Sequence, residues 1–240
     1  HIAANYNASV LYSSARNEYA ITRMNRILNR TVNTLQNHLR KGDFVPEGHE
    51  ISFHFADNME SVNIALTADE KMRLQGRIDR IDTTEDDGHV YVKVIDYKSG
   101  NRQFDLAAVY QGLQLQLVVY MNAAMEIESK KHPDKDVLPA ALLYYHLDDP
   151  LVENTGEMTP EEISAGLLQK LRMNGVVNGD LSIVDMLDHY MGDKSDVIPV
   201  EKKKDGTFSA RSSIMSREEL QVVSDYVNAK IKQIGKEILS

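Results

Sequence analysis

Residues 90–100 read Val-Tyr-Val-Lys-Val-Ile-Asp-Tyr-Lys-Ser-Gly, and this stretch decides the fold class and the site. Its β-branched and aromatic side chains favour a strand over residues 90–97. The strand ends in Asp-x-Lys, and side chains alternate between the two faces of a strand. The pattern therefore predicts that Asp96 and Lys98 lie on one face at the strand's end.

A second acidic strand precedes the first. Residues 76–82 read Gly-Arg-Ile-Asp-Arg-Ile-Asp, and the intervening Glu-Asp-Asp-Gly at 85–88 is a turn signal. The two segments together predict an antiparallel hairpin that turns at Asp87-Gly88. In such a hairpin Asp79 lies close to both Asp96 and Lys98.

Further elements follow from periodicity on both sides of the hairpin. Upstream, we expect a helix over 10–39 and strands over 50–55, 62–66 and 72–81. Downstream, we expect a helix over 106–125, a buried strand over 140–147, and helices that begin after Thr159, Ser182 and Ser216. The apolar stripe predicted for the first helix comprises Tyr12, Tyr19, Met24, Ile27, Leu28, Val32 and Leu35. Strands that alternate with helices indicate an α/β core.

Composition sets limits on the class of protein. The 240 residues are 42% hydrophobic and carry a formal net charge of −9, so a grip on DNA phosphates by a basic surface is not expected. No apolar run reaches the roughly 20 residues that a membrane span needs, and the chain has no Cys. We expect a cytoplasmic location with no membrane partner. Because the chain begins at His1 and leads directly into a helical pattern, we expect it to be part of a longer protein.

The cluster of Asp79, Asp96 and Lys98 suits phosphodiester cleavage. Two carboxylates and the peptide carbonyl of Tyr97 are oxygen ligands for a hard cation, Mg²⁺ or Mn²⁺. Such a cation polarises a phosphate and acidifies a bound water, and a nearby Lys stabilises charge on the phosphate. An isolated Asp-x-Lys is more often a surface ion pair, so the surrounding motifs have to decide between the two interpretations.

Three motifs in order carry a family resemblance: residues 76–82, residues 95–100 and residues 110–120, which read Tyr-Gln-Gly-Leu-Gln-Leu-Gln-Leu-Val-Val-Tyr. The sequence resembles the RecB-like PD-(D/E)XK nuclease domain of the AddB-type subunit of bacterial ATP-dependent helicase–nucleases (AddAB/RexAB). The resemblance continues through residues 44–53, 143–150 and 195–213, so it covers most of the chain.

The resemblance implies a restriction-endonuclease-like fold, with a mixed central sheet flanked by helices and a C-terminal helical extension. Its parts are a helical lead-in over 1–43, the nuclease core over 44–150, and the extension over 151–240 of the same domain. Asp79 and Asp96 are then the acidic metal ligands and Lys98 the catalytic lysine. Gln116 and Tyr120 form the third motif, next to the site. Helical spacing puts these two side chains on one face, but plain helix packing explains that spacing equally well.

The implied activity is a metal-dependent deoxyribonuclease of exonuclease type. It cuts one unwound strand, the one with the 5′ end, when double-strand DNA ends are processed for recombinational repair. The implied partners are single-stranded DNA and an AddA-like helicase subunit. The alternative is a non-catalytic nuclease-fold scaffold that guides DNA or docks a helicase.

Two departures from the family pattern concern ligands. The family's metal-binding His on a helix before the sheet has no counterpart in context, because His38 lies near the end of its helix and is interpreted as a solvated surface residue. The iron–sulfur cluster expected in the full parent needs Cys, which this chain lacks. We therefore expect the chain alone to fold but to cut DNA weakly or not at all.

Other charged residues are weaker candidates. Asp82 falls on the opposite strand face from Asp79 and is interpreted as structural. Glu50 either approaches the cluster or caps the core. Residues 85–87 are expected to form a solvated turn, and Lys202-Lys203-Lys204 a solvated charge run with a small chance of touching a DNA phosphate.

Overall fold

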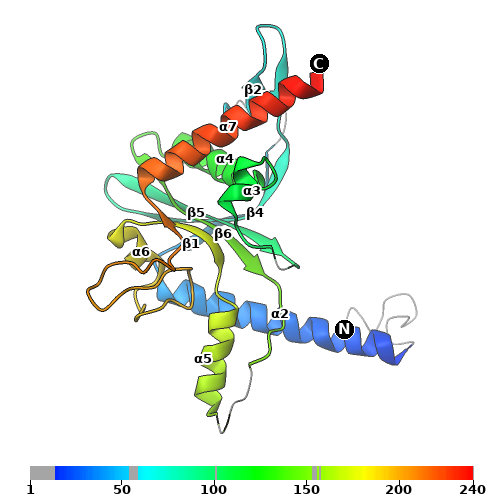
Figure 1. The fold of residues 1–240 in the computed structure, drawn as a ribbon, viewed down its shortest axis with the longest axis vertical. Coiled ribbons are helices and arrows are strands. Elements are labelled where there is room, and N and C mark those ends of the chain that lie inside the picture. Colours follow the sequence, from blue (N-terminus) through cyan, green and yellow to red (C-terminus); the bar gives the residue numbers. More distant parts are fainter. Residues whose placement is uncertain (1–13, 54–58, 101, 153–155, 157, 240) are drawn as a thin grey trace.

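A six-stranded mixed sheet forms the centre of the molecule (Figure 1). The computed structural model describes residues 14–53, 59–100, 102–152, 156 and 158–239. The strand order is β1-β4-β5-β6-β7-β8. The strands are β1 (Val45–Phe53), β4 (Gly76–Glu85), β5 (His89–Lys98), β6 (Asp136–His146), β7 (Asn174–Asn178) and β8 (Ile214–Met215). Pairs β5–β6 and β7–β8 are parallel and the other neighbours are antiparallel. Two short strands, β2 (Asn63–Ala65) and β3 (Lys71–Arg73), pair separately.

Helices cover both faces of this sheet. The helices are α2 (Ala15–Lys41), α3 (Leu106–Tyr110), α4 (Gln116–Lys131), α5 (Pro160–Lys170), α6 (Leu181–Leu187) and α7 (Arg217–Leu239). Figure 1 shows α4 and α7 above the sheet, and α2, α5 and α6 below it. The expected α/β fold, a mixed sheet flanked by helices with a helix at the C-terminal end, is confirmed.

Strand β5 shows how the sequence builds this two-sided core. Val92 and Val94 belong to the apolar cluster on the α4 side. Tyr91 and Ile95 belong to the cluster on the α2 and α6 side. A strand that is buried on both faces requires a nearly continuous apolar run. This is why residues 90–97 give such a strong strand signal.

The expected helix over 106–125 is wrong as a single element. It is divided into α3 and α4 by a turn around Gly112, whose φ of 83° lies in the left-handed region. Glycine adopts that region without the Cβ penalty of other residues. Apolar periodicity persists on both sides of the break and therefore does not reveal it. The break starts α4 at Gln116, next to the end of β5.

The apolar stripe expected to bury the first helix is also wrong. Tyr19, Met24, Leu28 and Val32 are 51–65% exposed, and Tyr12 lies outside the described residues. The buried side chains of α2 are instead Thr31, Thr34 and His38. Figure 1 shows α2 running past the edge of the sheet, so its first half has little to pack against. Its second half meets a polar part of the sheet, where Tyr145 lies against the two threonines and His38.

Two of the expected helix starts have the predicted caps. Thr159 and Glu162 form a reciprocal capping box at the start of α5, and Ser216 and Glu219 exchange the same pair of hydrogen bonds before α7. No strand was expected at β7 or β8, which extend the sheet at the β6 edge. Among the described residues, no helix combines the length and the apolar character that crossing a bilayer requires.

Candidate active site

The carboxyl ends of β5 and β6 bring the predicted residues to one edge of the sheet. These parallel strands end side by side at the right of the sheet in Figure 1. Asp96 is paired with Tyr144 of β6, and Lys98 with His146. Asp96 and Lys98 lie on the α4 face, like Val92 and Val94 before them, as the alternation predicts.

Asp79 reaches this edge from the neighbouring strand β4. The β4–β5 ladder pairs Arg80 with Ile95. One step further, the backbone N–H of Tyr97 donates to Asp79 Oδ2 at 2.8 Å. The Asp79 carboxylate therefore accepts the hydrogen bond that a backbone carbonyl of β4 would accept if the β4–β5 ladder continued. This contact places Asp79 directly beside the Asp96-Tyr97-Lys98 segment.

Asp96 is a buried carboxylate with one close cation. The residue is 3% exposed, and its Oδ2 lies 2.5 Å from Lys98 Nζ. Burial raises the pKa of Asp96, the hydrogen bond and charge of Lys98 lower it, and the negative charge of Asp79 raises it again. Two neighbouring carboxylates with a single compensating lysine leave an excess of negative charge, which suits a divalent cation.

Lys98 connects the carboxylates to helix α4. Its Nζ donates to Gln116 Oε1 at 3.1 Å, and Gln116 Nε2 donates to the Tyr120 hydroxyl at 2.7 Å. The Lys98 ammonium also lies 5.7 Å from the centre of the Tyr144 ring. Asp96, Lys98, Gln116 and Tyr120 therefore form one continuous chain of polar contacts. The five residues predicted as catalytic lie together, although their chemical roles stay predictions.

Comparison with protein families shows which family has this arrangement of sheet and site. A family model described as the PD-(D/E)XK nuclease superfamily matches residues 2–233. The chain belongs to the PD-(D/E)XK nuclease superfamily. This membership agrees with the mixed sheet and with the Asp-x-Lys at the end of β5.

Curated relatives within this superfamily share one name, that of an ATP-dependent helicase/deoxyribonuclease subunit. The chain is similar to the protein of that name from Alkaliphilus metalliredigens, with 39% identity over 236 residues and 98% of this chain. It is 43% identical over 244 residues to its namesake from Lachnoclostridium phytofermentans, and 37% identical over 231 residues to that from Clostridium tetani. The chain spans 20% of the length of each of these relatives.

The donor set fits the divalent metal typical of PD-(D/E)XK nucleases. Asp79 and Asp96 offer carboxylate oxygens, and Tyr97, which directly follows Asp96, offers a backbone carbonyl. Within the described parts of the chain, no group of three or more His, Cys, Asp or Glu side chains is arranged around a common ion position. Mg²⁺ commonly uses only one or two carboxylates and completes its shell with water and substrate phosphate. The residues present therefore fit Mg²⁺ better than a cation that requires a full set of protein ligands.

Sequence reasoning missed three residues around this PD-(D/E)XK site. Tyr144 lies beside Asp96, whose charge contributes, after burial, to raising the pKa of Tyr144. His146 lies beside Lys98, and its Nε2 is 2.6 Å from the carbonyl oxygen of Arg102. The charge of Arg102 acts on both Asp96 and Tyr144. Strand 140–147 was expected, but only its parallel register against β5 reveals these neighbours.

The weaker candidates lie outside this chain of contacts. Glu50 pairs with Arg77 at 2.7 Å, and both side chains are at least 60% exposed. Asp82 is fully buried between Arg80 and Lys93 on the opposite face of the sheet, as expected for a structural residue.

The interpretation of His38 as a solvated surface residue is wrong. The residue is 5% exposed and packs edge-on against Tyr145. Burial, together with the charge of Lys93, lowers the pKa of His38 to about 4. Its place near the end of α2 suggested exposure, but that end is the part of the helix that packs on the sheet.

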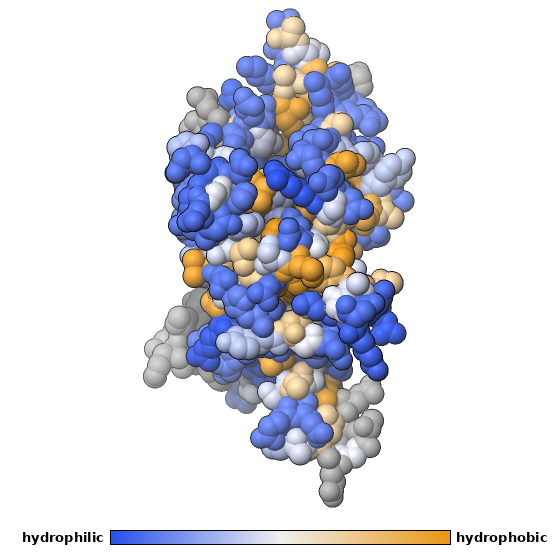
Figure 2. All heavy atoms as spheres, turned by 90° about the vertical axis from the view of Figure 1, so that its left-hand side faces the viewer, coloured by the Kyte–Doolittle hydropathy of each residue, from blue (hydrophilic) through white to orange (hydrophobic). Residues whose placement is uncertain are grey.

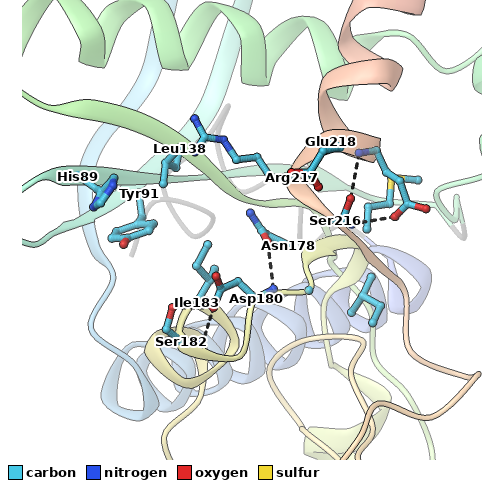
Figure 3. Close-up of a pocket in the computed structure, with 14 residues that line it drawn as sticks. His89, Tyr91, Leu138, Asn178, Asp180, Ser182, Ile183, Ser216, Arg217 and Glu218 are labelled. Carbon is cyan, nitrogen blue, oxygen red and sulfur yellow. Dashed lines mark hydrogen bonds between the residues drawn. The ribbon is translucent and has the colours of Figure 1, made fainter.

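A cavity of about 640 Å³ lies at the other end of the strands (Figure 3). It is lined by Tyr91, Asn178 and Arg217, among others, and by His89, which lies about 23 Å along β5 from Asp96. Two of its three acidic groups serve the structure, since Asp180 caps α6 and Glu219 caps α7. Figure 2, turned toward the left side of Figure 1, shows mostly hydrophilic side chains with hydrophobic groups near the middle. The cavity does not coincide with the PD-(D/E)XK residues.

Proposed function

We propose that this chain is a metal-dependent deoxyribonuclease domain that hydrolyses phosphodiester bonds at the carboxyl end of β5. The observation that carries the proposal is the meeting of Asp79, Asp96 and Lys98 at one edge of the sheet. Mg²⁺ or Mn²⁺, when bound, supplies Lewis-acid activation of the phosphate and a more acidic water. Asp79, Asp96 and the carbonyl of Tyr97 hold that cation.

In this proposal Lys98 acts on the phosphate or on the attacking water. An ammonium group has three N–H donors. Gln116 accepts one of them and Asp96 is the ion-pair partner of the ammonium, so a donor remains for a substrate oxygen. Gln116 and Tyr120 position the lysine from α4 through their own hydrogen bond. Holding the charge in place before the substrate arrives is a main source of catalytic stabilisation.

The wider role is proposed from the relatives, which are named helicase/deoxyribonuclease subunits. We propose that the domain acts as an exonuclease on one strand of unwound duplex, the strand with the 5′ end, during recombinational repair of DNA ends. Its partners are DNA and an AddA-like helicase subunit in the cytoplasm, and its full parent carries an iron–sulfur cluster. We keep the division into a lead-in over 1–43, a core over 44–150 and an extension over 151–240 as part of this proposal.

The alternative function is a non-catalytic scaffold that guides DNA or docks a helicase. The net charge of −9 favours it, because phosphate binding by this chain alone is then weak. The presence of both carboxylates and the lysine in contact favours the enzyme.

Metal binding and cleavage together separate the two functions. Mn²⁺ binding, followed by electron paramagnetic resonance, is expected to weaken in Asp79→Ala and in Asp96→Ala. Asp69→Ala, which removes an exposed carboxylate outside the site, is the matched control. End-labelled single-stranded DNA is then incubated with Mg²⁺ or Mn²⁺. We expect weak cleavage by this chain that disappears in Asp96→Ala. Manganese binding that ignores both aspartates, with no cleavage, would establish the scaffold.

A further inference from the structure

A polar cavity of about 340 Å³ adjoins the candidate active site on the β6 and β7 side. Its lining begins with Ser99 and Gly100, which directly follow Lys98, and continues with His146 at the end of β6. The opposite wall comes from Lys170, Arg172 and Asn174, between α5 and β7. The function proposed above does not use this cavity.

The sheet register ties the cavity to the carboxylates. Asp96 is paired with Tyr144, and Tyr144 is paired in turn with Asn174. Neighbouring strands lie 4.7–4.9 Å apart, so Asn174 is about 10 Å from Asp96 across the sheet. The cavity is therefore near enough for a nucleotide that adjoins a phosphate held at Asp96 to reach it.

One wall of the cavity is held in place from two strands. His146 Nε2 lies 2.6 Å from the carbonyl oxygen of Arg102. The backbone N–H of Phe104 donates to Asn174 Oδ1 at 2.8 Å. These contacts attach the segment after Lys98 to the ends of β6 and β7. The cavity is thus bounded by fixed groups.

Arg172 contributes a positive charge that no close acceptor neutralises. Its Nη1 atom is buried without a hydrogen-bond partner, and the nearest ion-pair contact is Glu201 Oε1 at 4.0 Å. Glu201 also faces Lys194 at 3.3 Å and Arg211 at 4.0 Å. One carboxylate shared among three cations leaves positive charge beside the cavity. A buried guanidinium donor without an acceptor is costly unless a ligand supplies one.

Lys170 adds a second cation to the lining. Its Nζ contacts the carbonyl oxygen of Leu151 at 2.5 Å, which leaves further N–H donors on the ammonium. The carboxylate in the lining is Asp148, which accepts from the backbone N–H of Asp149 at 2.7 Å. The cavity lining thus has two cations and one carboxylate. Its positive charge contrasts with the net charge of −9 for the whole chain.

We propose that this cavity is a nucleotide subsite, which holds the phosphate and sugar of the nucleotide next to the cleaved bond. Arg172 and Lys170 contact the phosphate, and Asn174 and His146 line the place of the sugar. The inference rests on the proposed nuclease function and extends it, because it says where the strand lies relative to the carboxylates. The ligand is a phosphate within a DNA strand rather than free inorganic phosphate.

Binding measured without catalysis tests the subsite. The chain is titrated against a fluorescent, 5′-phosphorylated octathymidylate in EDTA, at several salt concentrations. We expect Arg172→Gln and Lys170→Gln each to weaken binding about tenfold, the scale of a lost charge-assisted contact. The slope of log affinity against log salt should shrink by about 0.7 for each lost contact. Lys236→Gln, which removes an exposed lysine of α7 outside the cavity, should leave both quantities unchanged.

Further variants and a competition experiment separate failure of the subsite from failure to fold and from failure of the nuclease function. Lys170→Gln leaves the half-buried Arg172 in place, so it tests the subsite even if Arg172→Gln fails to fold, and Arg172→Lys should recover part of the affinity. Millimolar inorganic phosphate should compete only weakly, and full displacement by it would point to a free-anion site and overturn the inference. Cleavage that Asp96→Ala abolishes, with oligonucleotide binding unchanged in Lys170→Gln, would refute the subsite and keep the nuclease. Binding that depends on Lys170 and Arg172, without any metal-dependent cleavage, would keep the subsite and refute the nuclease.

Discussion

Two charged clusters lie on opposite faces of the same two strands. On the α2 side, Asp82 accepts from Arg80 at 2.5 and 2.7 Å and pairs with Lys93 at 3.0 Å. All three side chains are at most 8% exposed. On the α4 side, Asp96 pairs with Lys98, which is 22% exposed, and the negative charge of Asp79 also acts on Asp96.

The two clusters differ in how completely their carboxylates are paired with cations. Around Asp82, two cations surround one carboxylate, and the Phe44 ring covers the Lys93 ammonium at 4.8 Å. Around Asp96, burial raises the pKa of this carboxyl, and the negative charge of Asp79 raises it further against the opposing effect of Lys98. Residue types alone do not distinguish a structural cluster from a reactive one. The cluster with an excess of negative charge and a route to solvent is the one equipped to take a cation.

The largest effect is expected on the stability of the protein, when the buried Asp82 cluster on the α2 side is changed. Asp82→Ala leaves Arg80 and Lys93 buried without their partner, and the free energy of unfolding should fall by about 3–5 kcal/mol. Urea denaturation followed by circular dichroism measures this loss. Replacing all three residues by apolar ones of similar size (Arg80→Met, Asp82→Leu, Lys93→Met) should recover most of the stability. A single Asp82→Ala variant as stable as the original chain would show that the buried cluster is not needed for the fold.

On the open side, the expected loss is of activity. Lys98→Ala should reduce metal-dependent cleavage by about 10²–10³-fold, because it removes a positioned positive charge from the phosphate. In the full-length protein, proposed above to be a helicase–nuclease, DNA unwinding should continue at its normal rate. Rates of strand cleavage and of unwinding are measured on the same preparation. Near-normal cleavage by this variant would reduce Lys98 to an ion-pair partner of Asp96.

A smaller effect concerns His38, which lies next to the Asp82 cluster. Burial and the charges of Lys93 and Lys41 lower the pKa of His38 from 6.5 to about 4, against a smaller opposing effect of Asp196. Below pH 6.5 the unfolded chain binds a proton that the folded chain does not. Stability should therefore fall between pH 6.5 and 4, by up to about 1.4 kcal/mol per pH unit from this group.

The contribution of His38 is isolated by a difference. Unfolding free energies of the original chain and of His38→Gln are measured at pH 7, 6 and 5, and their difference removes the titration of all other groups. The gap between the two proteins should change in favour of the variant as the pH falls. A constant gap would show that His38 titrates normally in the folded state.

The smallest effect is expected at the exposed pair of Glu50 and Arg77. Both side chains are at least 60% exposed, and exposed pairs contribute less than about 1 kcal/mol. Arg77→Ala should therefore leave the unfolding free energy nearly unchanged, which makes it the surface control for Asp82→Ala. A loss comparable to that of Asp82→Ala would contradict the contrast drawn between buried and exposed charges.

The sequence alone determined the hairpin of β4 and β5 and the position of the candidate site on it. Residues 90–97 are mostly apolar on both faces, and this pattern is local, so it survives any arrangement of the other elements. The period of two in a strand places Asp96 and Lys98 on one face without knowledge of the neighbours. The hairpin turn at 85–88 then brings Asp79 alongside, because only a few residues separate the two strands.

Only the tertiary structure decided which other groups meet these residues. The parallel pairing of β6 with β5 puts Tyr144 and His146 beside Asp96 and Lys98, and parallel partners are set by packing across a long connection. The break at Gly112 lets α4 begin at Gln116, whose side chain accepts a hydrogen bond from Lys98. The buried face of α2 was mispredicted because amphipathic periodicity assumes an apolar surface opposite the helix. The sheet offers Tyr145 and Lys93 there, so Thr31, Thr34 and His38 are buried. Most of the apolar stripe faces outward, and of its members Leu35 packs against the core.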